Sequence, residues 1–210
     1  NTEHLINSDV DFLVVLGTTA ETPTLSLDEQ RSVLDFIIEL NNKRLPIVVG
    51  LASNNTKALC ERIENFDFKG VDAVLSASPN YNKPSQRGIV EHFTRVADAS
   101  PKPVILYNVP SRTGCDLLTE TIMKLVPYEN VVGLKDATGD LTRLEEILSQ
   151  LKVLDKNDFM LYSGDDPTAT QFMLNGGSGT ISVTANVVPS SIAEISKKDL
   201  SGETKMAIKL

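Results

Sequence analysis

The sequence predicts an α/β protein, and specifically a (β/α)8 TIM barrel of which seven strand–helix units are visible. Short β-branched apolar runs alternate with amphipathic stretches along the chain. The apolar runs are nearly continuous, as in parallel strands that are buried on both faces. Polar and reactive residues recur where these runs end. In barrels this rim of strand ends carries the chemistry, so the barrel is favoured over an open sheet.

Seven runs are expected to be strands: 11–19, 46–52, 72–79, 103–110, 131–137, 159–166 and 179–186. Helix signals lie between them. Ser26 and Glu29 have capping-box spacing ahead of a helix. The apolar face predicted for that helix contains Val33, Ile37 and Leu40. Asp140 is expected to cap a later helix, whose predicted apolar stripe is Leu141, Leu144, Ile147, Leu148 and Leu151.

The alternative architecture is an open, doubly wound sheet. Its dinucleotide-binding version needs GxGxxG at the first strand–helix turn, which this chain lacks. Seven strands are one fewer than a closed barrel needs, and residues 1–10 resemble the end of a helix that enters the first strand. An eighth strand is therefore expected to precede residue 1. The chain contains no linker or low-complexity segment, so residues 1–210 are expected to form a single, partial barrel domain.

Composition narrows the classes of function. The 210 residues carry a formal net charge of −8, with no basic run, which argues against nucleic acid and anionic membranes as partners. No export signal is evident, so a cytoplasmic location is expected. Cys60 and Cys115 are expected to be free thiols. His4 and His92 have no metal-ligand spacing, so a catalytic metal is not expected, and His92 is predicted to lie at a surface or an interface.

Lys135 ends the apolar run VVGL, where a charge is expensive to bury. One interpretation is a lysine that extends into solvent or pairs with Asp136. The other is a Schiff-base lysine, whose neutral amine attacks a ketone and whose pKa is lowered by an apolar pocket. Residue type alone leaves both interpretations open.

Other residues at the strand ends also have two interpretations. Tyr107 is either a core or interface tyrosine or a proton shuttle within reach of the lysine nitrogen. Arg112 is either a solvated loop residue or a fork for a substrate carboxylate. Thr18 and Thr19 offer hydroxyl and backbone N–H groups that can hold a carboxylate. Tyr81, on a proline-bounded loop, is typical of an interface residue.

With these residues in place, the chain resembles the dihydrodipicolinate synthase family, a pyruvate-dependent group of class I aldolases that also contains N-acetylneuraminate lyase. The resemblance runs from about residue 10 to residue 190. It rests on six motifs in order, namely GTTAE, PNYNKPSQRG, YNVPSRTG, GLKDATGD, YSGDD and GGSGTISVTANVVP.

The resemblance implies a set of roles. Lys135 matches the residue that forms the Schiff base with pyruvate. Tyr107, Thr18 and Tyr81 match a proton-relay triad, with Tyr81 donated across a dimer interface. The remaining matches are substrate-binding residues: Thr19 for the pyruvate carboxylate, Arg112 for the carboxylate of L-aspartate semialdehyde, and Gly164 and Ile181 lining the pyruvate pocket.

The resemblance also implies condensation of pyruvate with L-aspartate 4-semialdehyde, no cofactor, and a homotetramer built from dimers. The resemblance further leads us to expect that the family's first strand and last helices lie outside residues 1–210. Ala20 replaces the usual glycine of GTTGE, which predicts strain if its φ is positive. Asn54 agrees with the lysine-feedback pattern, whereas Ala58 and Asn80 depart from it. Two alternatives remain, a sibling aldolase acting on a sugar acid such as N-acetylneuraminate and a non-catalytic truncated barrel.

Overall fold

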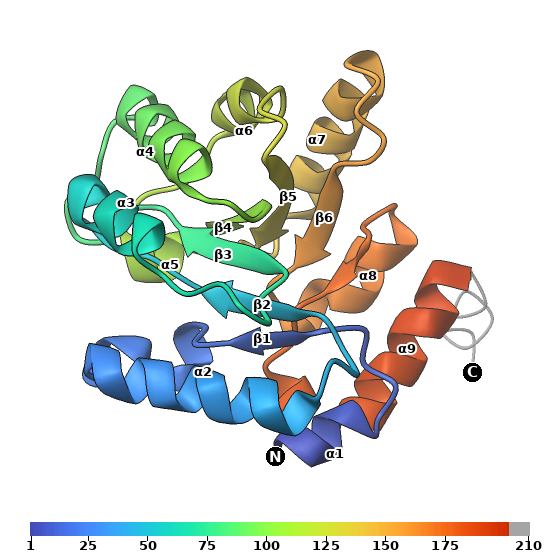
Figure 1. The fold of residues 1–210 in the computed structure, drawn as a ribbon. Helices are drawn as coiled ribbons and strands as arrows, with labels where there is room; N and C mark the ends of the chain where they lie inside the picture. Colours follow the sequence, from blue (N-terminus) through green and yellow to red (C-terminus); the bar gives the residue numbers. More distant parts are fainter. Residues whose placement is uncertain (202–210) are drawn as a thin grey trace.

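Seven parallel strands form one curved sheet in sequential order (Figure 1). The computed structural model describes residues 1–201. The strands are β1 (Leu13–Val15), β2 (Ile47–Gly50), β3 (Ala73–Ala77), β4 (Val104–Asn108), β5 (Val131–Asp136), β6 (Met160–Ser163) and β7 (Gly179–Thr180). A doubly wound sheet reverses its order at a switch point. The unbroken order therefore excludes that alternative. Each predicted run contains one strand, but the strands are shorter than predicted, and most of 179–186 lies outside β7.

Helices connect the strands and surround the sheet (Figure 1). The α-helices are α1 (Thr2–Ile6), α2 (Leu27–Asn41), α3 (Thr56–Glu64), α4 (Gln86–Ala99), α5 (Pro110–Thr113), α6 (Thr119–Leu125), α7 (Leu141–Val153), α8 (Ala169–Leu174) and α9 (Pro189–Ser201). Short 3-10 helices are η1 (Thr18–Ala20), η2 (Thr22–Thr24), η3 (Asp166–Thr168) and η4 (Thr184–Asn186). Within residues 1–201, no helix has the length and apolarity to cross a membrane.

Both predicted helix starts are confirmed. The Ser26 hydroxyl accepts from the Glu29 N–H, and the Glu29 carboxylate accepts from the Ser26 N–H. The Asp140 carboxylate accepts from the first N–H groups of α7. The predicted face of α2 is partly wrong, because Val33 is 38% exposed while Leu34 is fully buried. The buried residues of α2 are Gln30, Leu34 and Asn41. Two of them are polar, so a search for apolar residues alone does not find this face.

Three apolar clusters hold the sheet in place. Two lie between the strands and the helices and contain residues from both. The third lies inside the curve and comes from the strands and their ends, with Val48, Leu75, Ile105, Tyr107 and Val109 as its buried members. Side chains that alternate along one strand therefore reach different clusters, which is the layering of a barrel wall.

The sheet has two edges among the described residues, because β1 pairs only with β2 and β7 only with β6. The two edges line one cavity of about 140 Å³, together with residues of α1 and α9. The curvature thus brings β1 and β7 toward each other. The expectation of an eighth strand ahead of residue 1 stays a prediction.

His92 corrects a prediction. It was expected at a surface or interface, but its side chain is buried and its Nδ1 is 2.8 Å from the Thr56 hydroxyl. Burial lowers the pKa of His92 to about 4, so the ring is neutral at physiological pH. The prediction failed because His92 lies on the inner face of α4 with Ile89, Phe93 and Val96. Cys60 and Cys115 are both free, as predicted.

Candidate active site

A cavity of about 370 Å³ opens at the carboxyl ends of the strands. Its lining includes seven of the eight residues that the sequence singled out: Thr18, Thr19, Tyr107, Arg112, Lys135, Gly164 and Ile181. These residues come from the ends of five different strands or from the loops that follow them. The sequential order of the strands makes this convergence possible, since every strand ends on the same rim.

Lys135 is 8% exposed and extends into this cavity. Burial lowers the pKa of Lys135 from its ordinary 10.5 to about 8, against a smaller opposing effect of the Asp166 charge. Its Nζ lies 4.6 Å from the centroid of the Tyr107 ring. A substantial share of this lysine is therefore a neutral amine near pH 8, and it is not solvated at a strand end.

Asp136 is not the partner of Lys135. As the next residue along β5, it faces the opposite side of the strand. There its carboxylate accepts from Asn108 Nδ2 at 3.0 Å and from the Thr138 hydroxyl at 2.7 Å. The interpretation of Lys135 as one half of a pair with Asp136 is therefore wrong.

A register shift sets Tyr107 opposite Lys135. Val104 pairs with Val131, but Ile105 pairs with Gly133, so Val132 has no partner on β4. Without this β-bulge, Tyr107 would be opposite Leu134, which packs against the helices. After the shift, the side chains of β5 alternate in step with those of β4, so that Tyr107 and Lys135 are opposite each other and point to the same face of the sheet.

Gly164 makes room for the lysine. A Cβ atom at this position would lie 2.9 Å from Lys135 Cε and 2.9 Å from the Ala137 side chain. Since real Cβ atoms do not approach that closely, a larger residue here would displace the amine. The sequence placed Gly164 at the pocket through the family resemblance, and the structure supplies a steric reason.

The GTT turn forms the 3-10 helix η1 directly after β1, with Thr18 and Thr19 on the cavity. Ala20 does not have a positive φ, so the strain foreseen for that condition does not arise. The left-handed residues are instead Leu16 and Glu21, with φ of 58° and 51°. The Thr22 hydroxyl donates to the Leu16 carbonyl at 2.9 Å and so supports this turn.

Asp166 was missed by the sequence reasoning. Its carboxylate accepts from the N–H groups of Val183 and Thr184, at 3.1 and 2.8 Å, and from the Thr184 hydroxyl at 2.6 Å. These bonds hold the loop after β7 against the cavity. Burial raises the pKa of Asp166, but the hydrogen bonds together outweigh this effect and lower the pKa overall, which keeps a negative charge near Lys135. The acidic doublet Asp165–Asp166 after β6 is the sequence signal that could have found it.

Tyr81 is the predicted residue that the structure does not bring to this cavity. Its side chain is 85% exposed and its φ is 69°, and its N–H donates to the Thr113 carbonyl at 3.2 Å. The prediction that Tyr81 serves a neighbouring subunit stays a prediction. Over residues 1–201, no group of three or more His, Cys, Asp and Glu side chains could hold a metal ion.

Comparison with known proteins agrees with this geometry. The model of the dihydrodipicolinate synthetase family matches residues 1–210. The 4-hydroxy-tetrahydrodipicolinate synthase of Buchnera aphidicola subsp. Schizaphis graminum is 43% identical over 204 residues, which are 97% of this chain and 68% of that protein. The enzyme of the same name from Stutzerimonas stutzeri is 44% identical over 202 residues, or 96% and 68% of the two chains.

Solved structures show the same fold. The chloride-inhibited dihydrodipicolinate synthase of Acinetobacter baumannii, in complex with pyruvate, superposes with a TM-score of 0.92 at 39% identity. The match covers 99% of this chain and 70% of that one. The Thermotoga maritima dihydrodipicolinate synthase gives a TM-score of 0.93 at 32% identity, with the same coverage. Sequence, fold and cavity together establish that the chain belongs to the dihydrodipicolinate synthetase family.

Proposed function

We propose that the protein is a lyase that condenses pyruvate with L-aspartate 4-semialdehyde to give 4-hydroxy-tetrahydrodipicolinate, on the route to diaminopimelate and lysine. The observation that carries the proposal is Lys135, a buried amine of lowered pKa facing a cavity beside Tyr107. A neutral amine of this kind is what Schiff-base chemistry requires. The similarity to enzymes of this name supports the choice of substrates.

In the first step, Lys135 Nζ attacks the ketone carbon of pyruvate. A C–N bond forms, the carbonyl electron pair moves to oxygen, and that oxygen takes a proton. Loss of water gives the protonated imine, with Thr19 and its neighbouring N–H groups placed to hold the pyruvate carboxylate. We assign the movement of these protons to the Tyr107 hydroxyl, and the position of the Tyr107 ring, with its centroid 4.6 Å from Nζ, supports this. No cofactor or metal is invoked.

In the second step, the methyl carbon of the imine loses a proton and becomes an enamine. Its carbon attacks the aldehyde carbon of the second substrate, a C–C bond forms, and the aldehyde oxygen takes a proton. We assign Arg112, which is in the short helix α5 and lines the cavity, to binding the carboxylate of that substrate. Attack of the substrate's own amine on the imine carbon then closes the ring and releases Lys135 as a free amine.

Two further assignments belong to this proposal. We place the protein in the cytoplasm, which the two free cysteines support. We also infer a homotetramer of dimers in which Tyr81 joins Tyr107 and Thr18 of a neighbouring subunit. The exposed, left-handed tyrosine supports this, because a large ring held out in solvent at positive φ suits a residue that docks elsewhere.

The deciding experiment is borohydride reduction in the presence of pyruvate, followed by peptide mass mapping. The reduced adduct is expected on the peptide that contains Lys135 and is expected to be absent in Lys135→Met. Labelling elsewhere, or none, would reject the Schiff-base assignment. Turnover is then compared with L-aspartate semialdehyde and N-acetylneuraminate. Turnover of the sugar acid alone would replace the proposed substrate with that of the sibling enzymes.

A further inference from the structure

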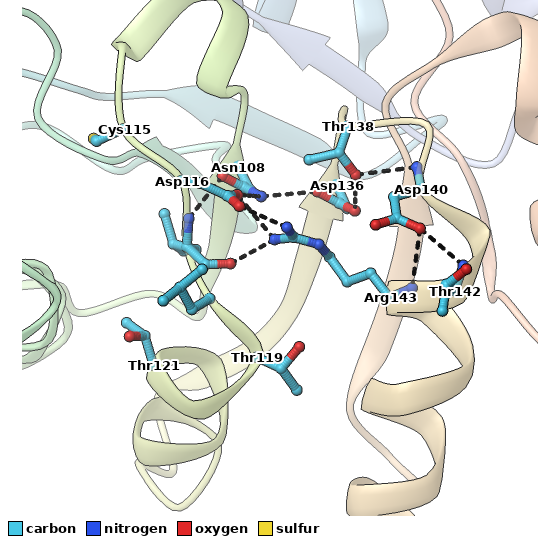
Figure 2. A network of polar contacts seen from close by, with 12 residues as sticks. Asn108, Cys115, Asp116, Thr119, Thr121, Asp136, Thr138, Asp140, Thr142 and Arg143 are labelled. Atoms are coloured by element: carbon cyan, nitrogen blue, oxygen red, sulfur yellow. Dashed lines mark hydrogen bonds and ion pairs between the residues drawn. The ribbon is translucent and has the colours of Figure 1, made fainter.

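A polar network centred on buried residues lies on the face of β4 and β5 opposite to Tyr107 and Lys135. Figure 2 shows its hydrogen bonds and ion pairs. Its centre is Asn108, which follows Tyr107 at the end of β4 and is 0% exposed. Across the sheet it pairs with Asp136, which follows Lys135. The two residues beside the reacting pair are therefore register partners on adjacent strands and are also hydrogen-bonded through their side chains.

The Asn108–Asp136 bond fits only the shifted register. It requires these residues to be opposite each other, which happens because the bulge at Val132 displaces β5 by one residue. In the unshifted register, Asn108 would be opposite Lys135. The side-chain bond therefore holds β5 in the phase that places Lys135 opposite Tyr107.

The Asn108 carboxamide uses both of its ends. Nδ2 donates to Asp136 at 3.0 Å and to Asp116 at 2.8 Å, while Oδ1 accepts from the Leu117 N–H at 3.1 Å. The neighbours fix the orientation of the amide, since the carboxylates accept and the Leu117 N–H donates. Aspartate has no N–H to give the two carboxylates, and alanine offers neither group.

Arg143, from the start of α7, completes the network. Its guanidinium donates to both oxygens of Asp116, at 2.9 and 2.6 Å, and to the Leu117 carbonyl at 2.6 Å. The Arg143 side chain is mostly buried. Figure 2 shows it reaching across to the segment that begins after Asn108. Residues 109–117 are thus tied at their far end both to the end of β4 and to α7.

The tied segment carries Arg112. It leaves β4 at Asn108, forms α5, and returns at Asp116 and Leu117 to the same carboxamide. Arg112 itself is exposed and lines the cavity. Its position relative to Lys135 is therefore set by the fixed ends of this segment rather than by packing around its own side chain.

We propose that Asn108 and Arg143 are positioning residues that hold the Arg112 segment and the Lys135 strand end in one fixed arrangement, and this rests on the proposed function. Asn108 acts on both parts, because it bonds to β5 and to the segment. The hydrogen bonds of Arg143 go to the segment alone, and Arg143 reaches β5 only through the attraction between its charge and Asp136. Their loss should therefore have different kinetic consequences, although both remove buried hydrogen bonds.

Arg143→Met tests the segment. We expect KM for L-aspartate semialdehyde to rise about 10- to 100-fold, because a displacement of about 1 Å is enough for such a loss. The rate of pyruvate trapping on Lys135 should stay near that of the wild type. Arg95→Met is the matched control, since Arg95 forms an exposed ion pair with Glu91 on α4, remote from the strand ends.

Asn108→Ala tests the strand end as well. We expect slower pyruvate trapping, with its pH dependence moved toward higher pH because a loosened strand end lets water reach Lys135. The control is Asn130→Ala, which also loses two side-chain hydrogen bonds, to the Ala97 and Ser100 carbonyls, but at the other end of β5. The Leu117 amide should lose hydrogen-exchange protection in Asn108→Ala alone.

The outcomes separate this proposal from the function on which it rests. If the wild-type protein does not trap pyruvate, the proposed function fails, while amide exchange at Leu117 still reports on the network. If both variants keep the wild-type KM and pH dependence and lose only folded protein, the residues stabilise the fold and position nothing. Equal effects of Arg143→Met on both substrates would also overturn the division of roles.

Discussion

At the scale of single residues, Lys135 combines a structural cost with a chemical use. A pKa of about 8 means that the charged form of Lys135 is less stable in the folded protein than in water, and at neutral pH this charged form still predominates. Two neighbours moderate this cost, the Tyr107 ring beside Nζ and the negative charge of Asp166. Residue type and position at a strand end were enough to predict Lys135 as a candidate. The neutrality of its amine depends on burial, which no local pattern reveals.

The first prediction concerns the pH dependence of pyruvate trapping. Only the neutral amine attacks, so the trapping rate should rise with pH and level off above about 8. The Asp166 charge raises the pKa of Lys135, so Asp166→Asn should move this rise to lower pH. The trapping rate would be measured between pH 6 and 10 by stopping the reaction with borohydride at successive times. The exposed Asp155→Asn is the control, and a shift to higher pH in Asp166→Asn would contradict the assignment.

The second prediction concerns stability. Lys135→Met should abolish trapping and yet stabilise the fold at pH 7 by about 3 kcal/mol, because a shift from 10.5 to about 8 reflects a penalty of that order on the buried charge. Below pH 8 the lysine is charged in both folded and unfolded chains, so the full gain is present. As the pH rises from 8 to 10.5 the folded lysine is already neutral, and the gain should shrink.

Urea unfolding at pH 7 and pH 10 measures both parts of this prediction. Lys57→Met is the control, because Lys57 is exposed. The free energy of unfolding of this variant should differ from that of the wild type by less than about 0.5 kcal/mol. If the stabilisation of Lys135→Met over the wild type grows between pH 7 and pH 10, burial does not destabilise the charged form of Lys135.

At the scale of elements, the strands and their order were predictable because each apolar run is short and bounded by polar residues. The capping box at Ser26 and the stripe of α7 were predictable for the same local reason. Other features depend on partners far along the chain. The bulge at Val132, the buried position of His92 and the bonds of Asp166 to residues 183 and 184 arise from tertiary contacts, and so the sequence alone does not reveal them.

The third prediction concerns Gly133 in β5. A Cβ atom here would lie 2.6 Å from the Met160 carbonyl oxygen, a backbone atom that cannot turn aside. Gly133→Ala should therefore destabilise the protein by about 1–3 kcal/mol and slow pyruvate trapping, because β5 must move relative to β6. Thermal unfolding and borohydride trapping measure the two effects.

Gly88→Ala is the matched control in α4, since its added Cβ would meet only the Pro84 and Ser85 side chains, at the ordinary contact distances of 3.4 and 3.5 Å. Alanine is favoured over glycine in a helix, so this variant should be as stable as the wild type or more so. Wild-type stability and trapping in Gly133→Ala would show that β5 tolerates movement and that the close contact does not set the site.

At the scale of the whole molecule, the curved sheet brings the ends of distant strands to one cavity, and Tyr81 alone among the predicted site residues stays outside it. The cavity was predictable as a rim of strand ends. The place of Tyr81 was not predictable from the residues themselves, because a tyrosine on a loop is equally compatible with a surface, an interface or a site.

The fourth prediction tests whether subunits share sites. If Tyr81 serves a neighbour, Tyr81→Phe should lose most turnover, and so should Lys135→Met. Mixed oligomers of the two variants should regain activity, because some sites combine an intact Lys135 with a neighbour's intact Tyr81. Co-refolding the variants and assaying turnover measures this. Activity no greater than the sum of the separate variants, in oligomers proven to be mixed, would confine each site to one chain.

The bulge in β5 has a further consequence for comparing this chain with others. Val132 is an extra residue in β5, so the alternation of side chains between the two faces of the strand changes phase at this residue. Counting forward from Val131 with strict alternation places Lys135 on the helix-facing side, whereas counting backward from Ala137 places it correctly in the cavity. Deleting Val132 would leave a regular strand in which Tyr107 and Lys135 still pair. The facing of Lys135 is therefore predicted correctly only when residues are counted from the carboxyl end of β5. A sequence alignment of the site residues should be fixed at that end of the strand.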